Sequence, residues 1–189
     1  MQTVASGSDA PHPADGLILR AAQVASQAHA GQTRKYNHRP YITHPARVAA
    51  ATMLQPGVTA AMACAAWLHD VVEDCGITID AIARDFGDDV ARLVSDLTKV
   101  DSPAATRADR AAAARRRLAS ADPRAKVIKL IDRIDNLREL DAAPAEIRAL
   151  YVEESQLLLE EALAGASPSL EAELRGEIAR HQQMLAEQG

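Results

Sequence analysis

The sequence predicts an all-α protein, a single bundle of about eight to ten helices. Of its 189 residues, 48% are hydrophobic but only 3% are aromatic, so most of the apolar mass is aliphatic. Much of this mass is alanine and leucine, which favour helices and allow helices to pack closely. Apolar residues recur at helical spacing, and no segment shows the alternation typical of a strand. The length fits one compact domain, which we expect to span residues 15–189 after a flexible polar start at 1–14.

Capping and breaking residues divide the first half of the chain. Asp15 and Pro45 are typical of a helix start, whereas Gly31 and Gly76 are typical of a helix end. Between the first two helices, the polar residues 32–43 predict an ordered loop. The signals predict, in order, helices over 16–30, 45–54 and 59–74, a fourth helix after 78 and a fifth over 88–99.

The second half continues with longer helices. A polar connection at 101–109 precedes an Ala/Arg-rich helix that ends near residue 119. Pro123 and Pro168 each suit the first turn of a helix. The last two helices are amphipathic and acidic, which indicates that one face of each is solvated. We expect a helix over 123–140, which completes a motif-bearing core at about 17–140. Two further helices are expected beyond this core, over 144–164 and 168–187.

The charge distribution limits the classes of ligand. The net charge is −5, yet residues 101–140 carry ten basic and six acidic side chains, while residues 141–189 carry three and ten. This pattern lacks the broad basic face of a nucleic-acid-binding protein and suits a small polyanionic ligand in a cleft. No apolar run approaches the ~20 residues that cross a bilayer, and the N-terminus lacks a signal-peptide pattern. We therefore expect a cytoplasmic protein with no nucleic-acid or membrane partner; a homo-oligomer stays open.

One short segment concentrates residues that bind metals or transfer protons. His69, Asp70, Glu73 and Asp74 lie within six positions. On a continuous helix, His69 lies over Glu73 and Asp70 lies over Asp74, so the four side chains form one polar stripe. The segment predicts a catalytic site.

Two residues distant in sequence extend this site. His44 precedes Pro45 at a helix start, and Asp132 interrupts an apolar run. Taken singly, a histidine at a helix start is usually a cap or a surface residue, and a lone aspartate can simply bond a neighbouring helix. Together with His69 and Asp70 they form a mixed nitrogen and oxygen set, which suits Mn, Fe or Zn with positions left open for water or phosphate.

Several further motifs stand in a specific order along the core: His29–Lys35, Pro40–Pro45, Leu68–Asp74, Phe86–Gly87, Val90–Ala91, Leu93–Val94, Thr98–Lys99 and Lys129–Leu137. In this order the chain resembles the HD-domain phosphohydrolases, and among them the hydrolase domain of the RelA/SpoT enzymes, which degrade the alarmones ppGpp and pppGpp. Its length is similar to that of the stand-alone small alarmone hydrolases, such as the metazoan SpoT homologue.

The resemblance implies a role for nine residues and a reaction. It implies a metal, commonly manganese in this family, held by His44, His69, Asp70 and Asp132. It also implies that Glu73 and Asp74 are a catalytic acidic pair. The residues implied to bind the nucleotide are Arg34, Lys35 and Asn136. The implied reaction converts ppGpp or pppGpp to GDP or GTP plus pyrophosphate, with ppApp-type substrates also in range. Read without the resemblance, Glu73 and Asp74 suit a solvated helix end, and Arg34 and Lys35 suit a loop surface.

Departures from the family pattern leave alternatives open. Cys75 and Asp135 stand where threonine and histidine are common, and residues 36–39 lack the usual glycine. The alternatives are an HD phosphohydrolase for NADPH or another nucleotide and a silent nucleotide-binding module, against which the retained ligands and acidic pair argue. Lys129 and Arg133 flank Asp132 on different helix faces; either could meet phosphate, and Arg133 could equally partner a carboxylate.

Overall fold

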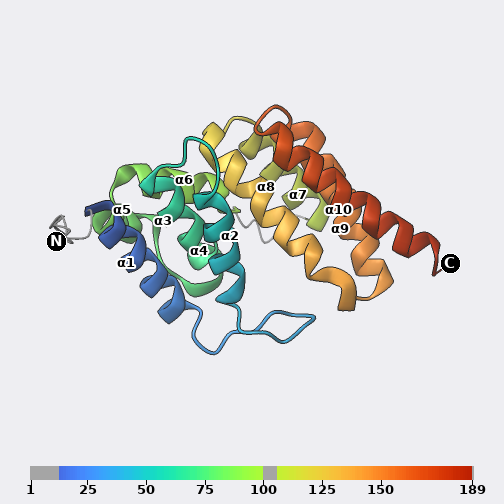
Figure 1. Cartoon of the computed structure of the whole chain (residues 1–189), viewed down its shortest axis with the longest axis horizontal. Coiled ribbons are helices and arrows are strands. Elements are labelled where there is room, and N and C mark those ends of the chain that lie inside the picture. Colours follow the sequence, from blue (N-terminus) through green and yellow to red (C-terminus); the bar gives the residue numbers. More distant parts are fainter. Residues whose placement is uncertain (1–12, 100–105, 189) are drawn as a thin grey trace, which may run out of the picture.

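The computed structural model describes residues 13–99 and 106–188, and every regular element in them is a helix (Figure 1). An isolated antiparallel bridge between Thr33 and Pro40 is the only β-type pairing in these residues. The predicted all-α class is therefore confirmed. The elements are α1 (Pro13–Ala28), α2 (Thr43–Met53), α3 (Ala60–Leu68), α4 (Val71–Cys75), α5 (Ile79–Phe86), α6 (Asp88–Leu97), α7 (Arg107–Ala119), α8 (Pro123–Arg138), the 3₁₀ turn η1 (Leu140–Ala142), α9 (Ala145–Leu158), the π-helical turn η2 (Leu159–Leu163) and α10 (Pro168–Ala186).

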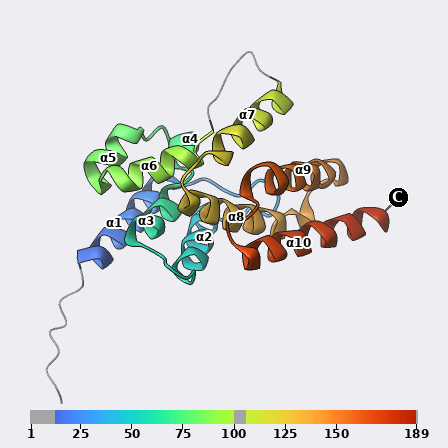
Figure 2. The same ribbon diagram turned by 90° about the horizontal axis from the view of Figure 1, so that it is seen from above.

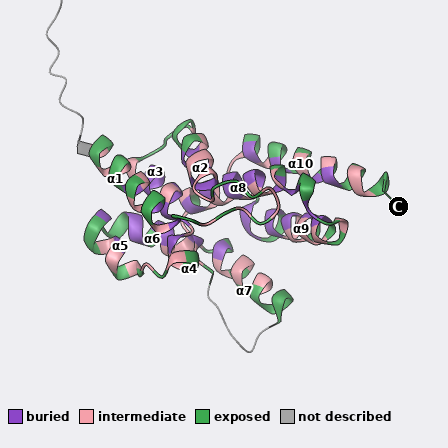
Figure 3. Cartoon of the chain, turned by 90° about the horizontal axis from the view of Figure 1, so that it is seen from below, coloured by how far each residue is buried: buried purple, intermediate pink, exposed green. Residues whose placement is uncertain are grey.

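Two helices, α3 and α8, organise the packing. Helix α3 is almost entirely buried and packs against α1, α2 and α6, because its alanines let the neighbouring backbones approach. Helix α8 packs against α2 and α6 on one side and α10 on the other, so it joins the N-terminal and C-terminal helices (Figure 1). Seen from above, α7 projects from this body (Figure 2). Buried residues gather along α8, while α5 and α10 expose their outer faces (Figure 3).

Most predicted boundaries hold to within a few residues, and the differences have local causes. Helix α1 begins at Pro13, so Asp15 lies in the first turn and is not the cap that we predicted. The predicted flexibility of 1–14 otherwise concerns residues outside those described, as does most of the predicted connection at 101–109. The last residues of that connection instead lie in α7, which begins at Arg107. Helix α7 follows Thr106, which forms a reciprocal capping box with Asp109. None of the described helices is long and apolar enough to cross a bilayer.

The predicted helix over 59–74 is wrong, because the chain breaks at His69 and Asp70. In a continuous helix the carbonyl of Ala66 accepts the N–H of Asp70. Here the ring Nδ1 of His69 donates to that carbonyl at 2.8 Å, and Asp70 takes a φ of −104° and a ψ of −9°. Helix α3 therefore ends at Leu68, and the short helix α4 ends at Gly76, whose φ of 71° suits glycine. The proposed stripe of four side chains on one helix is not formed.

The packing predicts which leucine matters for stability. Leu130 on α8 is 0% exposed, whereas Leu19 on α1 is 68% exposed. We expect Leu130→Ala to lower the free energy of unfolding by about 2–5 kcal/mol, because it leaves a cavity in the core. The matched change Leu19→Ala should alter it by less than about 0.5 kcal/mol. Urea denaturation of both variants measures the difference, and equal losses would contradict the central place of α8.

Candidate metal centre and substrate cavities

Four side chains from separate elements converge at the centre of the bundle. His44 comes from the first turn of α2, His69 and Asp70 from the break between α3 and α4, and Asp132 from α8. One ligand atom from each of His44, His69 and Asp70 lies within 4.8 Å of the others. The Nε2 atoms of the two histidines are 3.2 Å apart, and Oδ1 of Asp132 lies 3.2 Å from Nε2 of His44 and 3.7 Å from Nε2 of His69. The structure thus brings the four predicted ligands together.

The back of each imidazole is fixed by an acceptor. Nδ1 of His44 lies 2.6 Å from Oδ2 of Asp135, and Nδ1 of His69 lies 2.8 Å from the Ala66 carbonyl. Because both partners only accept, each Nδ1 carries a proton. In the neutral tautomer each Nε2 then presents a lone pair, and the two lone pairs face each other beside two carboxylates. This donor set fits a divalent metal between them.

The carboxylates of the cluster are held in turn. Tyr41 donates its hydroxyl to Oδ2 of Asp70 at 2.7 Å. Asp132 pairs with Nζ of Lys129 at 2.6 Å and accepts Nδ2 of Asn136, also at 2.6 Å. These contacts leave the carboxylates little freedom, so the cluster is preorganised for a bound ion.

The electrostatics of the cluster reflect its burial. Burial lowers the pKa of the His69 imidazole, but the charge of Asp70 and the hydrogen bond to Asp132 outweigh it and raise that pKa to about 10. Burial opposes ionisation of Asp132, yet the Lys129 ammonium and both imidazoles hold its pKa well below the ordinary value. In the metal-free protein the carboxylates therefore keep a proton on the imidazoles, and a bound metal would take its place.

The acidic pair lines a cavity of about 210 Å³ beside the cluster. Glu73 and Asp74 line it together with Asp70 and Asp132. Glu73 does not lie under His69; its carboxylate accepts the backbone N–H of Lys99 at 2.6 Å and pairs with Nζ of the same residue at 3.0 Å. Burial and the negative charge of Asp70 raise the pKa of Asp74.

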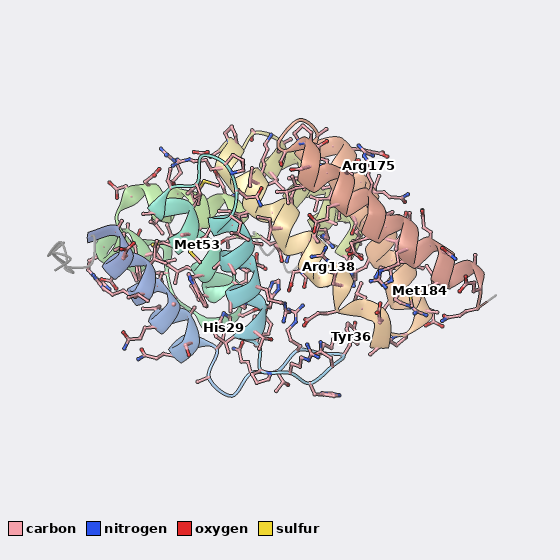
Figure 4. All side chains as sticks on the ribbon, viewed as in Figure 1. His29, Tyr36, Met53, Arg138, Arg175 and Met184 are labelled. Atoms are coloured by element: carbon pink, nitrogen blue, oxygen red, sulfur yellow. The ribbon has the colours of Figure 1, made fainter. Side chains whose placement is uncertain are left out.

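The loop between α1 and α2 carries Arg34 and Lys35 to the C-terminal half of α8. Nη2 of Arg34 donates to Oδ1 of Asn136 at 2.6 Å, and its guanidinium lies 5.2 Å from the Tyr41 ring. Lys35 points elsewhere, with Nζ 5.4 Å from the ring of Tyr36. Figure 4 shows Tyr36 in this loop beneath the end of α8. All these residues line a second cavity of about 260 Å³.

A third cavity, of about 490 Å³, lies among α6, α7, α8 and α9. Tyr151 of α9 lines all three cavities, so they adjoin one another. No sequence signal pointed to Tyr151, because α9 showed only an amphipathic acidic pattern. Asp135 carried a weak signal, since it departs from the family pattern. In the structure Arg47 donates to Asp135 through two nitrogens, at 2.6 and 2.9 Å.

The chain is similar to a known protein family, to several curated proteins and to solved structures. A family model described as "HD domain" matches residues 21–160. A probable GTP pyrophosphokinase of Mycobacterium leprae is 38% identical over 141 residues, which cover 74% of this chain and 18% of that protein. The chain thus spans less than a fifth of that relative and of the similar Streptomyces GTP pyrophosphokinases.

Shorter relatives match over most of their length. The guanosine-3′,5′-bis(diphosphate) 3′-pyrophosphohydrolase of Homo sapiens is 36% identical over 131 residues, 68% of this chain and 72% of that protein. Among solved structures, a metazoan orthologue of SpoT that hydrolyses ppGpp superposes with a TM-score of 0.79 and 28% identity. This match covers 92% of our chain and 98% of the other.

The ion pairs behind the site predict a pH-dependent stability. Burial opposes ionisation of Glu139, but Arg34, at 2.5 Å, and Arg47, at 2.6 Å, lower its pKa below the ordinary value. A depressed carboxyl pKa contributes stability above the unfolded pKa of about 4.3 and loses it as the pH falls through the folded pKa. We expect Glu139→Gln to destabilise the metal-free protein by about 1–2 kcal/mol at pH 7, and less as the pH falls below 4.

Chemical denaturation between pH 3 and pH 7 measures this difference. The control is Glu146→Gln, which changes an exposed glutamate of α9. If Glu139→Gln lowered the free energy of unfolding equally at every pH, Glu139 would stabilise the protein through packing and not through its charge.

Proposed function

The chain belongs to the HD-domain family, and from this we propose that it is a metal-dependent hydrolase of alarmone nucleotides that releases the 3′-pyrophosphate of ppGpp and pppGpp. The observation that carries the proposal is the pair of imidazole Nε2 atoms 3.2 Å apart, beside a cavity lined by an acidic pair. The names of the shorter relatives and of the superposed SpoT orthologue support the choice of substrate.

We assign the metal to His44, His69, Asp70 and Asp132, and we propose manganese. Imidazole nitrogens and carboxylate oxygens without a thiolate suit this ion, since the two cysteines, Cys64 and Cys75, are not in the cluster. When bound, such an ion lowers the pKa of a water molecule and neutralises charge on a phosphate.

The acidic pair then divides the remaining work. Asp74 lies on the cavity wall and is the residue to orient water and accept its proton. Glu73 pairs with Lys99 and so fixes that lysine at the cavity. Negative charge on Glu73 and Asp74 repels other anions. A phosphate therefore binds in this cavity only where positive charge offsets the two carboxylates.

The nucleoside occupies the second cavity. The Arg34 guanidinium is held by hydrogen bonds to Glu139 and Asn136. Lys35 and Tyr36 add a charge and a ring to the walls of the same cavity. A guanidinium or a ring can stack on a purine, whereas the Asn136 amide can bond ribose or phosphate. This arrangement favours a small polyphosphorylated nucleotide as the substrate.

A substrate panel tests the proposal. We expect metal-stripped protein to be inactive and Mn²⁺ to restore pyrophosphate release from ppGpp or pppGpp, because the cluster needs a cation. Parallel assays with ppApp and pppApp determine the base preference, and phosphate release from NADPH tests the alternative substrate. If NADPH alone reacts, the hydrolase chemistry stands and the alarmone assignment fails; metal binding without any turnover would favour a binding module.

Two substitutions separate metal binding from chemistry. Asp70→Ala should abolish turnover and weaken Mn²⁺ binding, because it removes a ligand. Asp74→Asn should lower kcat about 10²-fold or more while Mn²⁺ binding persists, because it removes the group proposed to accept the proton of the water. Asp141→Asn, an exposed carboxylate paired with Arg180, serves as the control. Full activity of either site variant would refute the assigned roles. Calorimetry adds a second check, because unchanged metal affinity in Asp70→Ala would refute its role as a ligand.

A further inference from the structure

The 210 Å³ cavity beside the His/Asp cluster, called the catalytic cavity below, is lined by basic side chains that are not equivalent. Four of them line its wall, and three are already paired with carboxylates at 2.5–3.0 Å; the pairs are Arg34–Glu139, Lys99–Glu73 and Lys129–Asp132. The fourth, Arg133, forms no ion pair within residues 13–99 and 106–188. Its charge is therefore available to a ligand, while the other three first neutralise the protein's own acids.

Arg133 is held in place by packing. It follows Asp132 on α8, and its guanidinium lies 5.3 Å from the centre of the Tyr151 ring. Its Nε is buried and has no hydrogen-bond partner among the described residues. An unsatisfied buried donor is unfavourable, and here the fold keeps a guanidinium with an unused donor. A planar guanidinium of this kind matches the oxygens of a phosphate.

The position of Arg133 indicates which phosphate of a substrate it can contact. Arg133, Lys99, Lys129 and Tyr151 line both the catalytic cavity and the 490 Å³ cavity, so they form the junction between the two. Beyond the junction the larger cavity remains basic; Arg117, for example, bonds Ser95 through Nη2 and pairs with no carboxylate among the described residues. A chain of phosphates that starts at the metal cluster meets positive charge in this direction.

We propose that Arg133 binds the terminal phosphate of the pyrophosphoryl group that the enzyme removes, and so selects a diphosphate over a monophosphate at the cleaved position. The inference rests on the proposed function. In the reaction, water adds to the phosphorus next to the ribose, the bond from this phosphorus to the 3′ oxygen breaks, the 3′ oxygen takes up a proton and pyrophosphate leaves. Arg133 contacts the phosphate that is not attacked, so it acts on specificity and on the charge of the leaving pyrophosphate.

Binding of inorganic pyrophosphate tests Arg133 without requiring turnover. Calorimetry of the metal-loaded protein compares the wild type with Arg133→Gln, Arg133→Lys and the control Arg138→Gln. Arg138 lies on the same helix but pairs with Glu173 and Glu177 on α10. We expect Arg133→Gln to weaken pyrophosphate binding about 10- to 100-fold and phosphate binding less than about 3-fold. Arg133→Lys, which keeps the charge but not the fork, should fall between, and it carries the test if the glutamine variant fails to fold.

A matched pair of nucleotides gives the specificity. Guanosine 5′-diphosphate 3′-diphosphate and guanosine 5′-diphosphate 3′-monophosphate differ only in the terminal 3′ phosphate. Arg133→Gln should lower kcat/KM for the diphosphate at least 10-fold and leave that for the monophosphate nearly unchanged. Equal losses for both, or a loss of GDP binding in place of pyrophosphate binding, would overturn the inference, the latter by placing the 5′ phosphates on Arg133. If the wild type hydrolyses neither nucleotide, the proposed function fails, and pyrophosphate binding still decides the role of Arg133.

Discussion

The structure depends on the approach of two histidine nitrogens and two carboxylates at the buried centre of the bundle. Nε2 of His44 and Nε2 of His69 are 3.2 Å apart, and Asp132 lies within 3.7 Å of both. Unpaired lone pairs and anions repel strongly where water is excluded, so this arrangement needs a proton or a cation between its members. The packing of α2 and α8 against α3 holds them together, since each of these helices buries apolar side chains in the core.

The helix break at His69 turns this packing into a site. Adjacent residues on a regular helix diverge by about 100°, so a continuous helix would direct the side chains of His69 and Asp70 away from each other. Because the His69 ring takes the carbonyl of Ala66, the chain turns, and Nε2 of His69 comes to lie 3.2 Å from Oδ2 of Asp70. One hydrogen bond thus ends the helix, fixes the imidazole tautomer and brings neighbouring side chains to the same point.

Local signals explain what the sequence could predict. Thr59, Thr78 and Asp122 cap α3, α5 and α8 through their own side chains, so these starts are encoded within three residues. The helix break escaped prediction because it depends on a side chain competing with the backbone. The four residues of the cluster were grouped by their residue types and positions, and the family resemblance supported assigning them to a metal. Contacts such as Arg47 with Asp135 join residues 88 positions apart and leave no pattern in one sequence.

The distribution of charge around the cavities gives the substrate a direction. Lys129 and Lys99 lie on the cavity wall but neutralise Asp132 and Glu73, so they stabilise the acidic site more than they attract a ligand. In the proposed function, a polyphosphate in the catalytic cavity would be held by the His/Asp cluster with its metal at one end and by Arg133 at the other. Since Arg133 is adjacent to Asp132 on α8, the helix that holds the cluster also sets its distance from the unpaired guanidinium. Under this proposal, a rigid helix and not a loop would set the spacing between the attacked and the terminal phosphate, as selection for a diphosphate requires.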